Sequence, residues 1–224
     1  MIREAIWDVD GTLVDTAKDH FRAWQQLTAE LRWSFGEADF ARTFGWRNPE
    51  ILRFLFDPNM SDATVAELGL RKETLYRESI AHGRVSLLPG VGRLLKELQA
   101  AGIRQVVGSS APRDNVTLLL TQSGIADFFA DIVTGDDVIQ GKPDPEVFLK
   151  GMTTSPEQCV VFEDAVAGVQ AAKAAGMACI AVTFACHHPA ASLYAAGADR
   201  VVSSFEELPT AEVLALAPGL GGKR

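Results

Sequence analysis

The chain has 224 residues, of which 47% are hydrophobic and 22% are charged, values that are ordinary for a globular protein. This length accommodates one large domain, or a core domain that carries a smaller insert. The formal net charge of -8 argues against nucleic acid or an anionic membrane surface as the main partner. A bound metal ion and a few basic side chains can still attract a phosphorylated substrate into a cleft.

The cysteines and the hydropathy pattern indicate in which cellular compartment the protein is found. Cys159, Cys179 and Cys186 show no spacing typical of a metal site, and their odd number favours free thiols in reducing surroundings. No apolar stretch has the length of a membrane span, and the first residues do not form a basic and then apolar leader. We therefore expect a soluble cytoplasmic protein, and we expect it to be a monomer.

The first predicted element is a short buried strand over residues 5–7, which are apolar and partly β-branched or aromatic. Asp8 and Asp10 follow with one residue between them, and a Gly-Thr pair ends the run. Regular strand geometry would place both carboxylates on one face, at the carboxyl end of a parallel strand where α/β sheets bind ligands. Such carboxylates repel each other unless a cation such as Mg²⁺ lies between them. The alternative is a loop with two solvated aspartates.

A helical insert is predicted after this strand. Residues 15–32 carry apolar side chains at helical spacing, and residues 35–56 form shorter helical pieces that glycine and proline interrupt. A long helix is predicted over residues 61–82, with Ser61 as its N-terminal cap. No convincing strand pattern interrupts this block. The predicted domains are a core of residues 1–15 and 85–224 and a helical cap of residues 16–84.

Strands and helices alternate through the rest of the chain. The predicted strands cover residues 103–108, 131–134, 159–162, 178–182 and 200–202. The predicted helices cover residues 91–101, 112–124, 145–152 and 165–175, and most end at a glycine. This alternation predicts right-handed crossovers and a doubly wound, Rossmann-like parallel sheet with helices on both faces. Residues 187–189 are predicted to form a loop and residues 219–224 an irregular tail.

Further polar groups stand beside the later predicted strands. Ser109 ends the strand over residues 103–108, and Lys142 lies in a stiff Gly-Lys-Pro turn. Glu163 and Asp164 follow the strand over residues 159–162. Taken singly, these residues are also explained as a turn residue, a surface charge and acids that cap a helix.

Together these residues resemble, in the right order, the four motifs of the haloacid dehalogenase superfamily. The first is Asp8-Val9-Asp10-Gly11-Thr12, and the others are carried by Ser109, Lys142 and Glu163-Asp164. The chain is similar to the β-phosphoglucomutase-like phosphatases of this superfamily, which have a helical cap. The resemblance implies that Asp8 is a nucleophile that forms an aspartyl-phosphate and that Asp10 is the general acid and base. Dehalogenating relatives lack the second aspartate, so Asp10 indicates a phosphotransferase.

The resemblance also implies roles for the remaining motif residues. Ser109 would hold a phosphoryl oxygen, and Lys142 would pair with the nucleophile and the phosphoryl group. Asp164 would bind Mg²⁺ directly, and Glu163 would be a further ligand or a supporting acid. Besides water and phosphate, the expected magnesium ligands are the carboxylates of Asp8 and Asp164 and the backbone carbonyl of Asp10.

The predicted cap is expected to set substrate choice by closing over the cleft. Residues 15–24 are similar to the opening of the cap in β-phosphoglucomutases, and Lys72 lies near the position of their phosphate-binding lysine. Arg47 lies near their phosphate-binding arginine but out of register, and residues 109–113 depart from the mutase-like Ser-Ala-Ser-Lys sequence. His20 and Arg113 are also explained as surface residues. The predicted substrate-binding residues are Gly11, Thr16, His20, Arg47, Lys72, Ser110 and Arg113.

The leading functional hypothesis is magnesium-dependent hydrolysis of a small phosphomonoester, specifically a sugar phosphate. The alternative is a phosphosugar mutase of the β-phosphoglucomutase type, in which a sugar hydroxyl instead of water attacks the aspartyl-phosphate. A third hypothesis is a binding or regulatory protein without catalysis. The intact set of Asp8, Asp10, Lys142 and Asp164 opposes this third hypothesis.

Overall fold

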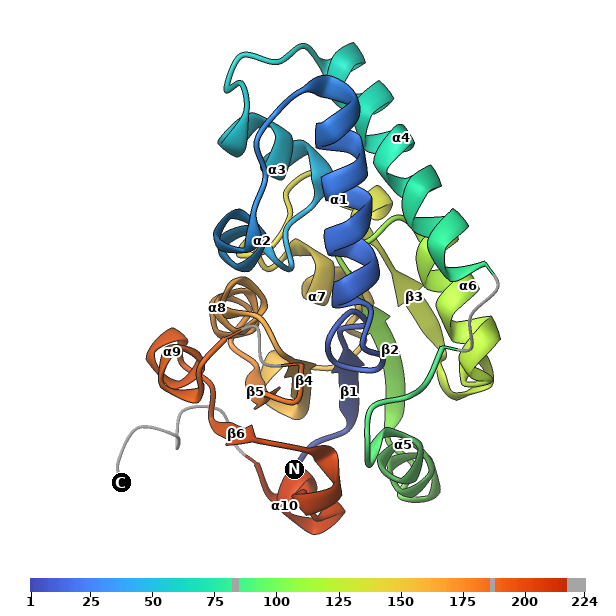
Figure 1. Cartoon of the computed structure of the whole chain (residues 1–224). Helices are drawn as coiled ribbons and strands as arrows, with labels where there is room; N and C mark the ends of the chain where they lie inside the picture. Colours follow the sequence, from blue (N-terminus) through green and yellow to red (C-terminus); the bar gives the residue numbers. More distant parts are fainter. Residues whose placement is uncertain (82–84, 186–187, 217–224) are drawn as a thin grey trace.

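A parallel sheet forms the centre of the computed structural model, which describes residues 1–81, 85–185 and 188–216. Its strands are β1 (Glu4–Trp7), β2 (Arg104–Gly108), β3 (Asp131–Val133), β4 (Cys159–Glu163), β5 (Ala178–Val182) and β6 (Arg200–Val202). They lie in the order β3-β2-β1-β4-β5-β6, and every neighbouring pair is parallel (Figure 1). The first strand therefore occupies the middle of the sheet, and all its residues are buried.

Helices cover both faces of this sheet. The face that includes Trp7 packs against α5 (Val91–Ala100), α6 (Arg113–Ser123) and α10 (Thr210–Ala215). The face that includes Ile6 packs against α7 (Glu146–Gly151), α8 (Val166–Ala174) and α9 (Ala190–Ala196). The two neighbouring residues belong to different clusters because successive side chains of a strand point to opposite faces. The predicted doubly wound α/β fold is confirmed.

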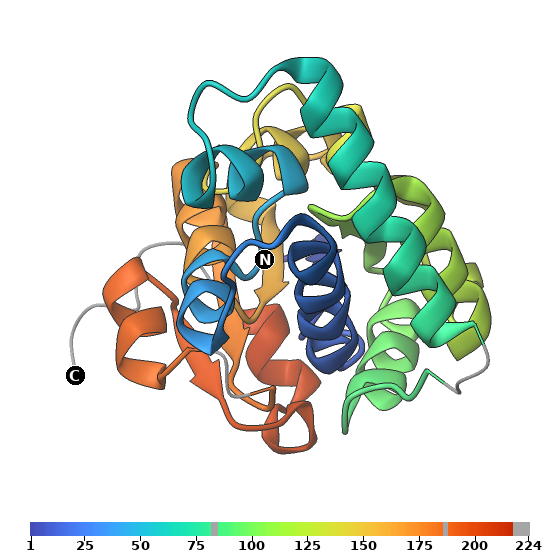
Figure 2. The ribbon, with the colours of Figure 1, turned by 45° about the horizontal axis from the view of Figure 1, so that its top comes forward.

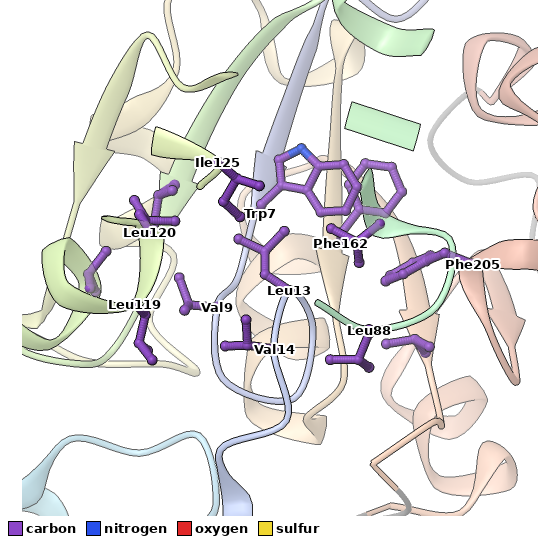
Figure 3. Close-up of a cluster of buried hydrophobic side chains, with 14 of the residues drawn as sticks. Trp7, Val9, Leu13, Val14, Leu88, Leu119, Leu120, Ile125, Phe162 and Phe205 are labelled. Carbon is purple, nitrogen blue, oxygen red and sulfur yellow. The ribbon is translucent and has the colours of Figure 1, made fainter. Parts of the chain in front are cut away.

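Stacked aromatic rings join the two central strands. Trp7 stacks on Phe162 of β4 with ring centroids 3.9 Å apart, and Phe205 meets both rings edge-on (Figure 3). All three side chains are fully buried. Because β1 and β4 pair in parallel with Trp7 opposite Phe162, the residues that follow the two strands emerge side by side at one edge of the sheet.

Four further helices lie between β1 and β2 in the chain. They are α1 (Ala17–Leu31), α2 (Glu37–Thr43), α3 (Asn48–Leu55) and α4 (Asp62–Ile80), and they stand over the carboxyl ends of the strands (Figures 1 and 2). Ser61 caps α4 by accepting a hydrogen bond from the backbone N–H of Thr64, as its position predicts. The chain leaves and re-enters the core through segments that touch at Val14 and Leu87. Within residues 16–81 there is no regular strand.

Several details differ from the predicted elements. The short helices α9 and α10 were not predicted, because six or seven residues give too little periodicity to show a buried face. In the described part of the chain, 3₁₀ turns also occur in connections, at Ala126–Phe128, Gly135–Asp137, Pro156–Gln158 and Phe205–Glu207. Cys186, residue 187 and the predicted tail over 219–224 lie outside the described residues, as do residues 82–84 of the predicted cap. None of the helices in the described ranges has both the length and the apolar composition needed to cross a membrane.

Candidate active site

The acidic residues of the predicted motifs converge at the carboxyl edge of the sheet. Asp8 follows β1 directly, Glu163 ends β4, and Asp164 is the next residue. Because the two strands are neighbours, each of these three carboxylates offers an oxygen within 4.8 Å of the others. This edge is where open α/β sheets bind ligands.

Lys142 provides the positive charge within this cluster. Its ammonium donates hydrogen bonds to Oδ1 of Asp8 at 2.7 Å and to Oε1 of Glu163 at 2.6 Å. Burial alone would lower the pKa of Lys142, but the two carboxylates raise it above its ordinary value. Lys142 is therefore a fixed cation beside the predicted nucleophile.

The remaining acids are not fully neutralised by this one lysine. Burial and the neighbouring Glu163 raise the pKa of Asp164 well above its ordinary value. Burial also raises the pKa of Asp8, although Lys142 opposes the rise. Oδ2 of Asp164 is buried and has no hydrogen-bond partner among the described residues. A buried pair of carboxylates with one free oxygen fits a divalent cation that prefers oxygen ligands, such as Mg²⁺.

Gly11 and Glu163 shape the cluster in different ways. Gly11 has a φ of +88°, and a Cβ there would lie 2.1 Å from Oδ2 of Asp164, so only glycine leaves room for this carboxylate. Glu163 uses both oxygens, since Oε1 accepts from Lys142 and Oε2 accepts the backbone N–H groups of Asp164 and Ala165 at 2.9 Å. This bonding favours the predicted role of a supporting acid over that of a direct metal ligand.

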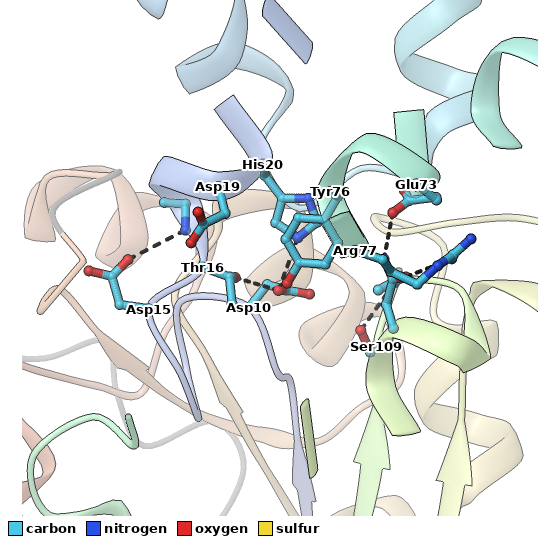
Figure 4. A network of polar contacts seen from close by, with 12 residues as sticks. Asp10, Asp15, Thr16, Asp19, His20, Glu73, Tyr76, Arg77 and Ser109 are labelled. Atoms are coloured by element: carbon cyan, nitrogen blue, oxygen red, sulfur yellow. Dashed lines mark hydrogen bonds and ion pairs between the residues drawn. The ribbon is translucent and has the colours of Figure 1, made fainter. Parts of the chain in front are cut away.

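Asp10 belongs to a second polar chain that reaches into the predicted cap. Its Oδ1 accepts hydrogen bonds from the Thr16 hydroxyl and from Nε2 of His20, the latter at 3.1 Å (Figure 4). Nδ1 of His20 in turn accepts from the ammonium of Lys72 at 2.7 Å. Because an ammonium can only donate, the proton of a neutral His20 sits on Nε2, facing Asp10. Burial alone would raise the pKa of Asp10, but His20, Thr16 and Lys72 lower it.

A cavity of about 530 Å³ separates the sheet edge from the cap helices. Its floor includes Asp8, Asp10, Ser109 and Asp164, while aromatic side chains such as Trp24 contribute to the cap side. The hydroxyl of Ser109 accepts a hydrogen bond from the backbone N–H of Ala111 at 3.1 Å. Carboxylates of the first and fourth motifs and the hydroxyl of Ser109 therefore line one cavity of a size that holds a small metabolite.

Besides the hydrogen bond from His20 to Asp10, cap segments contact the core at further places around this cavity. At Gly45, where φ is +86°, a Cβ would lie 3.0 Å from Cβ of Ala165. Glu73 of α4 accepts a hydrogen bond from the side-chain amide of Asn115 on α6. A further contact is made by Arg47, which directly precedes α3. Gly45 and Arg47 belong to the connection before α3 and Glu73 lies on α4, so two separate cap segments contact the core.

The guanidinium of Arg47 lies between the cap helices and the core. Its Nε donates to Glu50 at 2.9 Å, and its two terminal nitrogens donate to Glu50 again and to the backbone carbonyls of Gly135, Val138 and Ile139. All five N–H groups of the guanidinium thus have acceptors. Gly141 leaves room for this side chain, since a Cβ there would lie 2.7 Å from Nε of Arg47. In this conformation Arg47 joins the cap to the core and has no donor left for a substrate.

Arg113 is an exposed residue at the start of α6. Its guanidinium pairs with Asp137 at 2.6 Å and donates to the carbonyl of Ile132, and it does not line the cavity. The acids of the neighbouring Gly135–Asp137 turn hold this exposed side chain away from the site. Ser110, by contrast, lines the cavity and keeps a buried hydroxyl without a hydrogen-bond partner among the described residues.

Sequence reasoning missed several polar residues around Lys72. Glu73 accepts hydrogen bonds from Lys72 at 2.9 Å and from the amide of Asn48 at 2.7 Å, and Arg77 donates to Asn115 at 3.0 Å. Glu73 and Arg77 are four residues apart on one helix, which is a visible pattern. That pattern alone does not show that both side chains meet Asn115 of the core.

Known proteins resemble this chain in sequence and in structure. Residues 2–176 match the haloacid dehalogenase-like hydrolase family. Protein CbbY of Rhodobacter capsulatus is 36% identical over 79% of this chain and 83% of its own, and β-phosphoglucomutase of Bacillus subtilis is 33% identical over 81% and 83%. A phosphoglycolate phosphatase of Pseudomonas syringae is 33% identical over 82% of this chain and 70% of its own. The crystal structure of β-phosphoglucomutase from Clostridium difficile has a TM-score of 0.84 at 27% identity, covering 95% of this chain and 96% of that one.

The chain therefore belongs to the haloacid dehalogenase-like hydrolase family. The predicted membership and the predicted enzyme class, a phosphotransferase of this family, are both confirmed.

Proposed function

We propose that the protein is a magnesium-dependent phosphatase that hydrolyses a small phosphomonoester, specifically a sugar phosphate, through an aspartyl-phosphate on Asp8. The observation that carries this proposal is the position of Asp8 on the floor of the cavity, 2.7 Å from Lys142 and beside the free Oδ2 of Asp164. The buried free thiols of Cys159 and Cys179 suit the cytoplasm, where we place the reaction.

In the proposed first step, a carboxylate oxygen of Asp8 attacks phosphorus and the ester oxygen leaves with a proton from Asp10. Lys142 offsets the negative charge that gathers on the phosphoryl oxygens, and Ser109 donates its hydroxyl to one of them. The metal site would use the carboxylates of Asp8 and Asp164 and the carbonyl of Asp10. A bound Mg²⁺ would neutralise charge and favour the carboxylate form of Asp8.

In the proposed second step, water attacks the phosphoryl group and transfers a proton to Asp10, while the bond to Asp8 breaks. The hydrogen bonds from Thr16 and His20 fix the orientation of the Asp10 carboxyl group for this step. We propose that the four helices over residues 17–80 act as the cap of the active site, with the domain limits predicted above. Closure excludes bulk water while the substrate is bound.

The test uses the purified chain with Mg²⁺ and a panel of sugar phosphates, measuring free phosphate and isomerised sugar phosphate in parallel. We expect phosphate release that stops when a chelator removes the metal and returns when Mg²⁺ is restored. Release that continues unchanged in chelator would rule out the metal-dependent mechanism.

A phosphosugar mutase is the second candidate. The chain from Lys72 through His20 to Asp10 favours it, because this chain links the cap to the proposed acid and base. The bonding of Arg47 opposes it, since a mutase must hold a second phosphate and this guanidinium has no free donor. The deciding assay contains β-glucose 1-phosphate, Mg²⁺ and a trace of the 1,6-bisphosphate. Formation of glucose 6-phosphate that far exceeds phosphate release, and that collapses in Lys72→Ala, would establish the mutase instead.

A further inference from the structure

The basic side chains that line the cavity differ in how their charge is balanced. Within the described residues they are Arg47, Arg53, Lys72 and Arg77. Each of the first three makes an ion pair with one carboxylate, respectively Glu50, Asp62 and Glu73. Arg77 makes no ion pair in the described structure, and its one hydrogen bond goes to a neutral amide. Arg77 is thus the lining cation whose charge no carboxylate there offsets.

The amide that holds Arg77 is itself fixed in orientation. Asn115 is fully buried at the start of α6, where its Oδ1 accepts from Arg77 at 3.0 Å and its Nδ2 donates to Glu73. The charge of Glu73 is already balanced by Lys72 at 2.9 Å. The guanidinium is therefore oriented through one nitrogen, and its remaining N–H donors have no acceptor among the residues that the structure describes.

The surrounding charge makes this cation significant for substrate choice. The cavity is lined by more acids than bases, including Asp8, Asp10 and Asp164 on its floor. An anionic group on the body of a substrate would be repelled there unless a cation received it. Lys142 is buried against Asp8 and Glu163 at the phosphoryl site, and Arg47 is saturated by its own acceptors. Arg77 remains available for that group.

We propose that Arg77 binds a second anionic group on the substrate, a carboxylate or a phosphate separate from the phosphoryl group that is transferred. The inference rests on the proposed phosphoester cleavage in this cavity and defines its substrate class. The preferred substrates are phosphomonoesters that carry a further oxyanion. A guanidinium suits this role because its planar donors match the two oxygens of such a group.

Matched pairs of substrates test the proposal. One pair is phosphoglycolate and 2-hydroxyethyl phosphate, which differ by a carboxylate in place of a hydroxymethyl group. The other is glucose 1,6-bisphosphate and glucose 1-phosphate, which tests phosphate as the second anion. We expect the wild-type protein to favour the doubly anionic member of at least one pair in kcat/KM by about tenfold or more, the size of one charge-assisted hydrogen bond. The pair that shows the preference identifies the anion.

Three variants separate binding from support of the fold. Arg77→Gln should abolish the preference within the pair by raising the KM of the doubly anionic member. Arg77→Lys should retain part of the preference. Arg71→Gln is the control, because Arg71 lies on the same helix but is exposed and paired with Glu30 on α1. A merely structural role for Arg77 would change both members of a pair by the same factor, and that result would overturn the proposal. So would the absence of a preference in the wild-type protein for both pairs.

Binding measurements keep this test independent of turnover. Calorimetry with phosphoglycolate and glucose 1,6-bisphosphate, on Asp8→Asn protein with and without Arg77→Gln, reports the anion site directly. Weaker binding by the double variant than by Asp8→Asn alone supports the anion site at Arg77. This holds even if the wild-type protein hydrolyses none of the compounds, because the lack of hydrolysis would reject only the proposed phosphatase activity. Hydrolysis by the wild-type protein, together with equal binding by the single and the double variant, would reject only the role of Arg77.

Discussion

The ammonium of Lys142 lies 2.7 Å from Oδ1 of Asp8, although 134 positions separate the two residues in the chain. The same ammonium contacts Glu163 at 2.6 Å, so one cation is shared between a residue that follows β1 and the last residue of β4. Both acids are buried, and bulk water therefore screens these charges little. The lysine is held where it can stabilise negative charge on a group transferred to Asp8.

Replacement of Asp8 by asparagine should remove turnover and preserve the fold. Asparagine has nearly the same shape but cannot form the phosphoenzyme, so we expect kcat to fall by more than about a thousandfold. The thermal midpoint should stay equal or rise, because the change removes one acid from a crowded buried cluster. Steady-state kinetics and calorimetric unfolding measure the two effects. Near wild-type turnover would end the covalent mechanism.

Asp164→Ala should weaken binding of Mg²⁺ without comparable loss of stability. The carboxylate that disappears has a buried oxygen with no protein partner in the described structure, so the apo fold loses little. We expect the affinity for Mg²⁺ to fall by roughly tenfold or more in calorimetric titration. Asp114→Ala is the control, since Asp114 lines the same cavity but is exposed and lies outside the acid cluster. Equal affinity in the Asp164 variant and the control would remove Asp164 from the metal site.

Arg47→Met should loosen the contact between cap and core. The variant loses hydrogen bonds to the carbonyls of Gly135, Val138 and Ile139, so amide exchange in that loop should accelerate by about tenfold or more. Activity toward singly and doubly phosphorylated sugars should fall by the same factor. Arg53→Met serves for comparison, because Arg53 bonds only within the cap, to Asp62 and Met60. A loss confined to doubly phosphorylated sugars would return Arg47 to the phosphate-binding role.

Glu4 should make stability depend on pH far from the active site. Burial alone would raise its pKa, but hydrogen bonds from Thr153, Arg104 and Thr154 outweigh burial and lower the pKa from 4.5 to about 2. Because the folded pKa is the lower one, the ionised form stabilises the fold fully above about pH 4.5 and this contribution disappears as the pH falls toward 2. Its size is about 3 kcal/mol in the free energy of unfolding.

Urea unfolding of Glu4→Gln at several pH values measures this contribution. We expect the variant to be less stable than the wild type at pH 7 and to show a flatter decline below pH 4.5. Glu67→Gln is the control, since Glu67 is exposed. Identical pH dependence in the wild type and in Glu4→Gln would contradict the assignment.

The sequence by itself determined the sheet and the convergence of its acids. Apolar β-branched runs predict strands locally, and helices between them make the strands parallel. Parallel strands end at a common edge, so Asp8, Glu163 and Asp164 had to meet wherever β1 and β4 became neighbours. The prediction of the strands depends on the local pattern of apolar residues, and the prediction of the parallel sheet depends on the right-handed crossovers between strands. Both can be inferred from a single sequence.

Only the tertiary structure decided how the cap meets the core. His20 and Lys72 are 52 positions apart, Glu73 and Asn115 are 42 apart, and Arg47 bonds to carbonyls near residue 138. The resemblance placed Arg47 on the substrate, whereas docking of the cap gave its five donors to Glu50 and the core loop. No periodicity encodes such contacts, because they depend on the relative position of two separately packed parts. For the same reason, Arg77 became a candidate for substrate binding only when its neighbours were known.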